Sequence, residues 1–256
     1  MSFRVVTFNI QNGEPFDESN PNCSDQDIIG TCQFLQRLDA DLLFLQEVER
    51  GVDGGMQVEP PPNYQILKNH FPSHDSVFSY PLKNDTEIPF GLGLAIFSKT
   101  PLRDFHKIDL PAADLEFEFA GKRRHASPRL LIEVSTTIDG RDIRLMNTHL
   151  QAFFMIGSSS ESYLEQRNII EQRLKYHSHG PTILTGDMNS APGECIVEQF
   201  SKIGFETAQN TQATWQRHPY IVDHIFFNAQ LVRNKVQVIQ SSVSDHFPLV
   251  ADMNFS

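Results

Sequence analysis

Residues 129–150, RLLIEVSTTIDGRDIRLMNTHL, contain two apolar, β-branched runs on either side of Asp139-Gly140. An Asp-Gly pair in this position is typical of a two-residue β-hairpin turn. Residues 129–138 and 141–150 are therefore predicted to pair as antiparallel strands. The second strand ends in the polar residues Asn147 and His149. The stretch thus predicts a central hairpin that carries an imidazole at one end.

Strands and helices alternate on both sides of this hairpin. Apolar runs predict further strands at residues 3–10, 41–48, 92–98, 182–185, 221–227, 235–240 and 247–254. Helices are predicted at residues 25–38 with Ser24 as the N-cap, at residues 161–177, and at residues 192–203 with Gly204 as the stop. Residues 49–63 are rich in Gly and Pro and predict a loop. We expect one domain over residues 1–256, with strands inside and helices outside.

The composition is that of an ordinary globular protein, with 39% hydrophobic and 21% charged residues in a chain of 256. No apolar run approaches the roughly 18 residues of a membrane span, and the N-terminal segment does not resemble a secretory signal. The three scattered cysteines, Cys23, Cys32 and Cys195, suggest neither a disulfide framework nor a thiolate metal site. We therefore expect a cytoplasmic monomer without a stable protein partner.

The net charge of −11 disfavours tight non-specific binding to long nucleic acids, because an acidic chain repels a polyanion. A local basic run, Lys122-Arg123-Arg124-His125, is followed by Arg129. Arg124 is a candidate for binding a substrate phosphate. The alternative is a solvated loop, which is the usual fate of a charge run.

Polar residues recur where the predicted strands end: Asn9, Glu47, Asn147, His149, Asp187, Asn189, Asp223, Asp245 and His246. Functional side chains concentrate at strand ends because the sheet fixes them while loops leave room for a substrate. Carboxylates gathered there would repel one another unless they bound a cation, and oxygen ligands without thiolates favour Mg²⁺ or Mn²⁺. With amides and imidazoles beside the cation, the set suits hydrolysis of a phosphate ester.

Six short motifs in this set resemble those of the endonuclease/exonuclease/phosphatase superfamily, in its deoxyribonuclease and neutral-sphingomyelinase branches. They are Thr7-Phe8-Asn9-Ile10, Leu45-Gln46-Glu47, Asn147-Thr148-His149-Leu150, Gly186-Asp187-Met188-Asn189, Asp223-His224-Ile225-Phe226 and Ser244-Asp245-His246. The resemblance implies an α+β fold, a four-layer sandwich of two mixed β-sheets packed face to face with helices outside. It also implies a phosphodiesterase that depends on Mg²⁺ or Mn²⁺.

The resemblance further implies a role for each polar residue. Glu47 would be the principal metal ligand, with Asn9 beside it and Asp245 near the metal. The implied catalytic residues are His149 at the scissile phosphate and Asp187 with Asn189 at the water or leaving group. His246, oriented by Asp223, would be the general base or would stabilise the phosphate. Either Asp187 or His246 could take the proton of the attacking water. We favour His246, because the ordinary pKa of histidine lies near neutrality.

Three other features have two interpretations each. Trp215 and Arg217 lie just before the Asp223 strand and could contact the substrate or belong to a packed loop. Residues 153–156 are apolar and could form core, or else a flap over the site or a lipid contact, and core is favoured. His224 would point away from Asp223 on a strand, so we expect it to pack rather than to react.

The substrate is the least determined part of the prediction. A nucleic acid is the first choice, and a sphingomyelinase-like or inositol-phosphate phosphoesterase is the alternative. His149 occupies a position where abasic-site endonucleases usually carry tyrosine, so that activity is not expected. A non-catalytic binding module of the same fold is the remaining alternative, disfavoured because every polar position of the motifs is filled.

Overall fold

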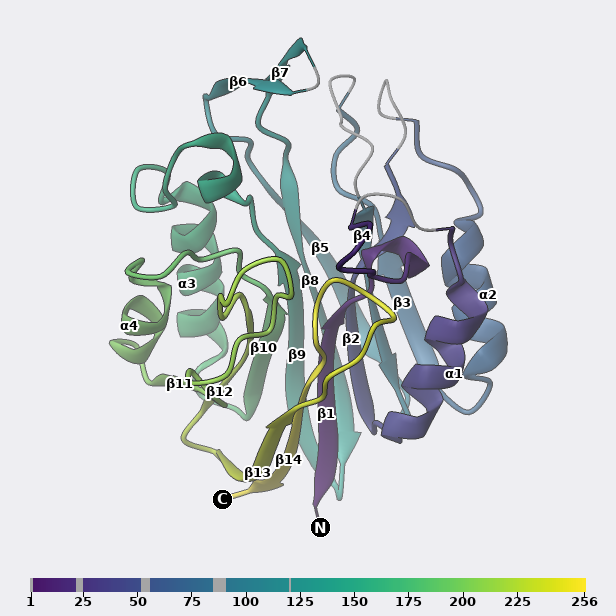
Figure 1. Cartoon of the computed structure of the whole chain (residues 1–256). Helices are drawn as coiled ribbons and strands as arrows, with labels where there is room; N and C mark the ends of the chain where they lie inside the picture. Colours follow the sequence, from purple (N-terminus) through teal and green to yellow (C-terminus); the bar gives the residue numbers. More distant parts are fainter. Residues whose placement is uncertain (1, 22–24, 52–55, 85–90, 120) are drawn as a thin grey trace.

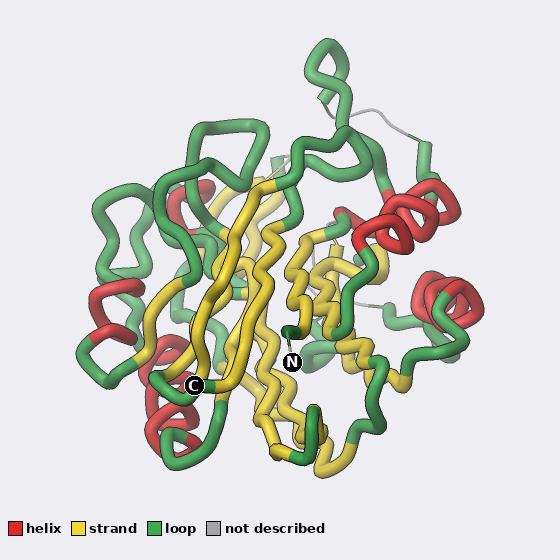
Figure 2. The backbone as a smooth tube through the Cα atoms, turned by 90° about the horizontal axis from the view of Figure 1, so that it is seen from below, coloured by secondary structure: helices red, strands yellow, loops and turns green. Residues whose placement is uncertain are grey.

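The computed structural model describes residues 2–21, 25–51, 56–84, 91–119 and 121–256. Two mixed six-stranded sheets pack face to face, and helices cover the outer face of each (Figures 1 and 2). The predicted α+β four-layer sandwich is confirmed. Among the described residues, no helix is both long and apolar enough to cross a bilayer.

The first sheet has its parallel pair, β1 and β2, near the centre. Its strands, in spatial order, are β13 (Leu231–Val238), β14 (Leu249–Phe255), β1 (Phe3–Asn9), β2 (Leu42–Arg50), β4 (Gly91–Ser98) and β3 (Asp75–Ser79). Helices α1 (Ile28–Leu38) and α2 (Pro62–His70) cover its outer face, and the short 3₁₀ turn η1 (Gln11–Gly13) follows β1.

The second sheet contains the predicted central hairpin, whose strands pair from Leu131 with Thr148 to Ile138 with Arg141. Its strands, in spatial order, are β11 (Phe205–Thr207), β12 (Asp223–Asn228), β10 (Thr182–Asp187), β9 (Arg141–His149), β8 (Arg129–Ile138) and β5 (Arg103–Leu110). Helices α3 (Glu165–His177) and α4 (Ile196–Ser201) cover it, and the 3₁₀ turn η2 (Phe153–Ile156) follows β9. A separate hairpin of β6 (Glu116–Phe119) and β7 (Lys122–His125) projects beyond the sheets.

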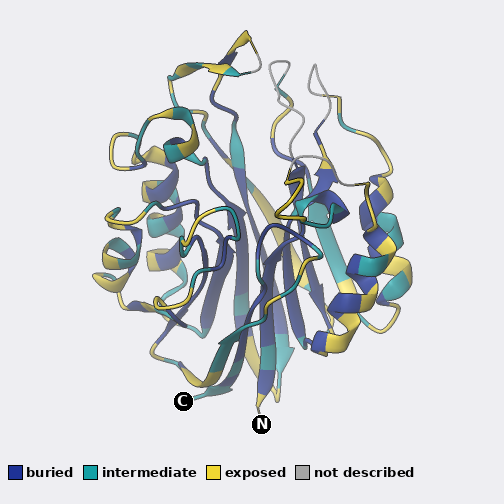
Figure 3. Cartoon of the chain, viewed as in Figure 1, coloured by how far each residue is buried: buried dark blue, intermediate teal, exposed yellow. Residues whose placement is uncertain are grey.

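Side chains that face the other sheet change from apolar to polar along each central strand. On β1, Phe3 and Val5 belong to the core between the sheets, whereas Thr7 and Asn9 continue the same face as buried polar residues. The same change occurs on β9 between Leu145 and Asn147 and on β10 after Ile183, while the antiparallel β12 begins with its polar residue. One end of the interlayer space is therefore hydrophobic and the other is polar. The central strands are buried along most of their length (Figure 3).

Several predicted boundaries were wrong at helix starts. The first helix begins at Ile28, where the Asp27 side chain accepts a hydrogen bond from Gly30 N at 2.8 Å; the predicted cap, Ser24, lies outside the described residues. The helix predicted at residues 161–177 begins at Glu165, and the one predicted at residues 192–203 is confined to Ile196–Ser201.

Helix α2 was missed because its N-terminus is held by a distant residue. The Glu49 carboxylate on β2 accepts a hydrogen bond from Tyr64 N at 2.8 Å, in place of a cap next to the helix. The polar edge strands β3 and β5 were also missed, and the basic run predicted as a loop forms β7. The last two predicted strands are shifted, to Leu231–Val238 and Leu249–Phe255.

Candidate active site

Glu47 enters the polar end of the interlayer space because β2 is irregular at this point. Leu43 and Leu45 pack under the helices on the outer face, so a regular strand would send Glu47 there too. A bulge between Gln46 and Glu49, with a φ of 51° at Glu47, turns the carboxylate the other way. A Cβ atom at Gly91 would lie 2.3 Å from the Glu47 side chain, so only glycine leaves room beside it.

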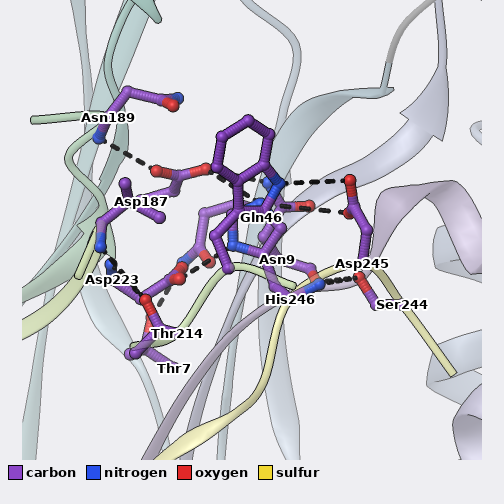
Figure 4. A network of polar contacts seen from close by, with 12 residues as sticks. Thr7, Asn9, Gln46, Asp187, Asn189, Thr214, Asp223, Ser244, Asp245 and His246 are labelled. Atoms are coloured by element: carbon purple, nitrogen blue, oxygen red, sulfur yellow. Dashed lines mark hydrogen bonds and ion pairs between the residues drawn. The ribbon is translucent and has the colours of Figure 1, made fainter. Parts of the chain in front are cut away.

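Asn9 joins the two sheets across the site (Figure 4). Its Nδ2 donates to Glu47 Oε1 at 2.9 Å and to Asp187 Oδ2 at 3.0 Å. Its Oδ1 accepts from Gln11 N at 3.0 Å, which fixes the orientation of the amide. A neutral donor thus holds two carboxylates close together without cancelling their charge.

His149 and Asn189 lie on the other side of Asp187. The parallel pairing of β9 with β10 places His149 opposite Asp187, and His149 Nε2 lies 3.5 Å from Asp187 Oδ2. Asn189 Nδ2 lies 3.0 Å from His149 Nε2, and Asn189 N donates to Asp187 Oδ1 at 3.0 Å. Burial, with the positive charges of Arg129 and His246, holds the pKa of His149 well below its usual range, so the ring is neutral.

His246 is bonded to a buried carboxylate, as the sequence predicted. Its Nδ1 lies 2.8 Å from Asp223 Oδ2, and its Nε2 lies 3.6 Å from Asp187 Oδ2. Burial is the largest single effect and lowers the pKa of His246, but Asp223, Asp187 and Asp245 together outweigh it and raise the pKa to about 10. The imidazole is therefore protonated at neutral pH in the metal-free protein.

Asp245 is held by the two residues that were candidates for substrate contact. Its Oδ2 accepts from Trp215 Nε1 at 3.3 Å and from Arg217 Nε at 2.6 Å. Both residues thus position a site carboxylate, and their contact with substrate stays a prediction. Arg124 lies on β7 of the projecting hairpin and is only 9% exposed, and its substrate contact also stays a prediction.

Three residues close to the site were absent from the predicted set. Arg129 is near enough for its charge to act on both Glu47 and His149, and its Nη2 donates to Gln151 Oε1 at 3.2 Å. The hairpin register could have revealed it, because pairing of Leu131 with Thr148 brings the start of β8 to the end of β9.

The other two are hydroxyl residues that hold the Asp223–His246 pair. Ser244 Oγ donates to Asn9 O at 2.7 Å and accepts from His246 N at 3.1 Å, and Thr214 Oγ1 accepts from Asp223 N at 3.0 Å. Ser244 belongs to the Ser-Asp-His motif and could have been included from the sequence, whereas nothing local marked Thr214.

The cluster has the donors that a hard divalent cation requires. Glu47, His149 and Asp187 each offer a ligand atom within 4.8 Å of the others, and so do Asp187, Asp223 and His246. Burial and then the charge of Asp245 raise the pKa of Glu47 to about 7, and burial also raises the pKa of Asp187 to about 7. A bound cation would relieve the repulsion between these two neighbouring carboxylates once they are ionised. The described groups in the cluster are oxygen and imidazole donors without a thiol. The residues therefore fit Mg²⁺ or Mn²⁺.

The predicted packing of His224 agrees with the structure, whereas the predicted core packing of residues 153–156 holds only in part. His224 is buried, with its Nδ1 2.9 Å from Thr207 Oγ1, on the face of β12 away from Asp223. In the turn η2, Phe153 is buried as expected for core, whereas Met155 is exposed.

Comparison with known proteins gives one match to a family and a group of similar folds. The model of the Endonuclease/Exonuclease/phosphatase family matches residues 6–246, and no curated protein matches the sequence. An endonuclease/exonuclease/phosphatase from Beutenbergia cavernae is 17% identical with a TM-score of 0.72, over 100% of this chain and 72% of that one. A mannosyl-6-phosphatase from Bacteroides thetaiotaomicron is 16% identical with a TM-score of 0.70, over 99% of this chain and 100% of that one. The human nocturnin catalytic domain is 20% identical with a TM-score of 0.66, over 100% of this chain and 95% of that one. At these identities the solved structures show a shared fold.

Proposed function

Since this chain belongs to the endonuclease/exonuclease/phosphatase family, whose members hydrolyse phosphoester bonds, we propose that it is a phosphodiesterase dependent on Mg²⁺ or Mn²⁺. The observation that carries the proposal is the convergence of Glu47, Asp187 and His246 around the Asn9 amide, from three distant parts of the chain. Glu47 would hold the cation, with Asn9, Asp187 and Asp245 around it. When bound, the cation would supply Lewis-acid stabilisation of charge on the phosphate.

The charge states of His246 and Asp187 suggest which chemical role each side chain could take. His246 is protonated at neutral pH, because its pKa is raised to about 10 by the surrounding carboxylates. It therefore suits stabilisation of a phosphate oxygen, which argues against our expectation that it is the general base. Asp187 is the other candidate for taking the proton of an attacking water, because burial raises its pKa to about 7 in the metal-free protein and its carboxylate accepts a hydrogen bond from Asn189 N. Asn189, bonded to Asp187, would orient that water for in-line attack.

Neutral and cationic groups complete the arrangement. His149 is neutral and can exchange a hydrogen bond with the scissile phosphate while Asn189 holds its ring. The guanidinium of Arg129 offers a positive charge near Glu47 and His149, where the phosphate would sit. Each residue thus acts on the phosphate or the water through an atom that other side chains fix in place.

A nucleic acid remains the first candidate substrate, and a small phosphoester such as an inositol phosphate or a phospholipid headgroup is the second. The second is favoured by the charge distribution, because the chain carries a net charge of −11. In addition, Arg123 and His125 on the projecting hairpin both pair with Glu116, at 3.3 and 3.5 Å. The hairpin thus presents less positive charge to a polyanion than its sequence suggests.

The test is a substrate panel with wild-type protein and the His246→Ala variant, each with Mn²⁺, Mg²⁺ or EDTA. The panel contains single-stranded and duplex DNA, RNA, sphingomyelin vesicles and inositol phosphates. We expect metal-dependent cleavage of at least one member and loss of most turnover in the variant, with circular dichroism confirming that it is folded. Equal rates for both proteins would contradict the proposal, and metal binding without turnover would favour a non-catalytic module.

A further inference from the structure

Two loops leave the second sheet beside the candidate active site and are tied together by carboxylates. The first loop, residues 150–164, follows β9, and the second, residues 188–195, follows β10. Glu194 of the second loop accepts hydrogen bonds from Ser159 Oγ at 2.7 Å, Ser160 N at 2.8 Å and Ser160 Oγ at 2.7 Å. It also accepts from Ala191 N at 3.0 Å in its own loop. One carboxylate is thus satisfied by four donors, three of them from the other loop.

The hydrogen bonds between the two loops run in both directions, and Arg167 on α3 supports the first loop. Glu161 of the first loop accepts from Cys195 N of the second at 2.8 Å. Arg167 on α3 is 2% exposed, and its Nη1 donates to Glu161 Oε1 at 2.7 Å and to Ser160 Oγ at 3.1 Å. Each loop therefore offers a carboxylate to the other, and the buried guanidinium of Arg167 fixes the first loop at Ser160 and Glu161. Hydrogen bonds to charged groups in such a setting are stronger than neutral ones.

The first loop carries aromatic residues that pack against the site. Phe154, in η2, has its ring centroid 5.6 Å from that of Trp215 and 5.6 Å from that of Tyr220. Trp215 in turn donates to Asp245 and forms a β-bridge with His246. Phe154 thus connects the first loop to Trp215, which in turn contacts the terminal Asp-His pair.

We propose that Glu194 is a positioning residue, whose bonds to Ser159 and Ser160 hold Phe154 against Trp215. Phe154 and Trp215 together form an aromatic wall of the site, on which the substrate binds. Within the described part of the chain, the hydrogen bonds of the Glu194 carboxylate go to Ser159, Ser160 and Ala191, none of which is a candidate site residue. Its loss should loosen the wall without removing a reacting group. The kinetic consequence rests on the proposed function, whereas the packing consequence does not.

The packing consequence can be measured without a substrate. Trp215 is the only tryptophan of the chain and is 7% exposed, so acrylamide quenching of its fluorescence reports opening of the wall. We expect Glu194→Gln to raise the quenching constant by roughly twofold, and Ser159→Ala, which removes one hydroxyl, to raise it less. The matched control is Glu198→Gln, because the Glu198 side chain is 62% exposed and pairs with Lys202 on the surface of α4. Unchanged quenching in folded Glu194→Gln and Ser159→Ala proteins would overturn the proposal.

The kinetic arm uses whichever phosphoester the wild-type protein cleaves. Glu194→Gln should raise KM by about tenfold, as expected from loss of charged hydrogen bonds, with kcat within about twofold of wild type. A fall in kcat at unchanged KM, or altered quenching with unaltered kinetics, would refute the role in substrate binding. If the wild-type protein cleaves nothing, the proposed function fails, while the fluorescence result still decides whether Glu194 holds the wall.

Discussion

Replacing Glu47 by glutamine should stabilise the metal-free protein while removing its activity. The Glu47 carboxylate is surrounded by protein, and burial, followed by the charge of Asp245, raises its pKa from 4.5 to about 7. Because the folded-state pKa is above that of the unfolded chain, the folded state binds the proton more tightly. The stability contributed by Glu47 is therefore complete below pH 4.5 and is lost as the pH rises through about 7.

The size of the effect follows from the pKa. One pKa unit corresponds to about 1.4 kcal/mol, so a rise from 4.5 to about 7 makes ionised Glu47 destabilise the fold by about 3 kcal/mol at pH 8. This is an upper value, because 17% of the side chain is exposed to solvent. Glutamine keeps the oxygen that accepts from Asn9 Nδ2 but carries no charge. The variant should thus gain up to about 3 kcal/mol of unfolding free energy at pH 8 and little at pH 4.5.

The assay is urea denaturation of both proteins in EDTA between pH 4.5 and pH 8, repeated at pH 8 with excess Mn²⁺. The difference between the two proteins isolates Glu47 from other titrating groups, such as the buried Glu49. With Mn²⁺ the order should reverse, since a ligand that binds only the folded wild type stabilises it. Glu198→Gln, at an exposed position, should show neither the gain in stability in EDTA at pH 8 nor the loss of stabilisation by Mn²⁺. A wild type that is more stable than Glu47→Gln in EDTA at pH 8, or a variant that Mn²⁺ stabilises equally, would refute the reasoning.

Three other substitutions test separate parts of the site. Asp223→Asn removes a carboxylate that raises the pKa of His246. Turnover should fall by about 10²-fold or more, and the alkaline limb of the pH–rate profile should move to lower pH. An unmoved limb would exclude protonated His246 as the acting group. Arg129→Gln should lower kcat/KM by about tenfold. NMR titration should show a higher pKa for His149, because a neighbouring positive charge is removed. An unchanged pKa of His149 would place the guanidinium away from the site. Gly186→Ala should destabilise the protein by more than about 2 kcal/mol in urea, because Gly186 has a φ of 150° and a Cβ there would lie 2.1 Å from Thr148 O. Gly180→Ala, where a Cβ would meet nothing within 4 Å, is its control; equal stability of the two alanine variants would contradict the steric argument.

The strands that form the site could be predicted because they obey simple rules. The runs before Asn9, His149 and Asp187 are rich in apolar and β-branched residues, and each ends in polar residues. The structure shows that this change of polarity occurs on the face between the sheets, so the same pattern that predicts a strand also predicts which end carries chemistry. The Asp-Gly turn fixed the register of the central hairpin correctly.

The parts that were missed depend on contacts between distant segments. Strand alternation alone would place Glu47 under the helices, and the bulge at Gln46–Glu49 that redirects it is set by pairing with β4. Helix α2 depends on Glu49, thirteen residues before its first turn begins at Pro62, and the edge strand β5 is largely exposed and lacks an apolar pattern. Such features follow from the assembled fold rather than from local sequence.

The protonation of His246 was also beyond the sequence. An isolated histidine has a pKa near neutrality, and the expectation that it acts as a base rested on that value. Three carboxylates around the buried ring raise its pKa to about 10. Asp245 is its neighbour in sequence and Asp223 was expected from the motif resemblance, whereas the fold brings Asp187 to within 3.6 Å of His246 Nε2. The charge state of His246 in the metal-free protein therefore depends on the three-dimensional arrangement, and its role as general base stays a prediction.

The most direct test of the account is the position of the cation. A crystal of the wild-type protein soaked in Mn²⁺ and measured near the manganese absorption edge should show an anomalous peak at about 2.2 Å from a Glu47 carboxylate oxygen, close to the distance at which hard cations bind oxygen. The peak should vanish in Glu47→Gln crystals treated in the same way. A strong peak elsewhere on the molecule, or an unchanged peak in the variant, would contradict the claim that this cluster is a metal-dependent phosphoesterase site.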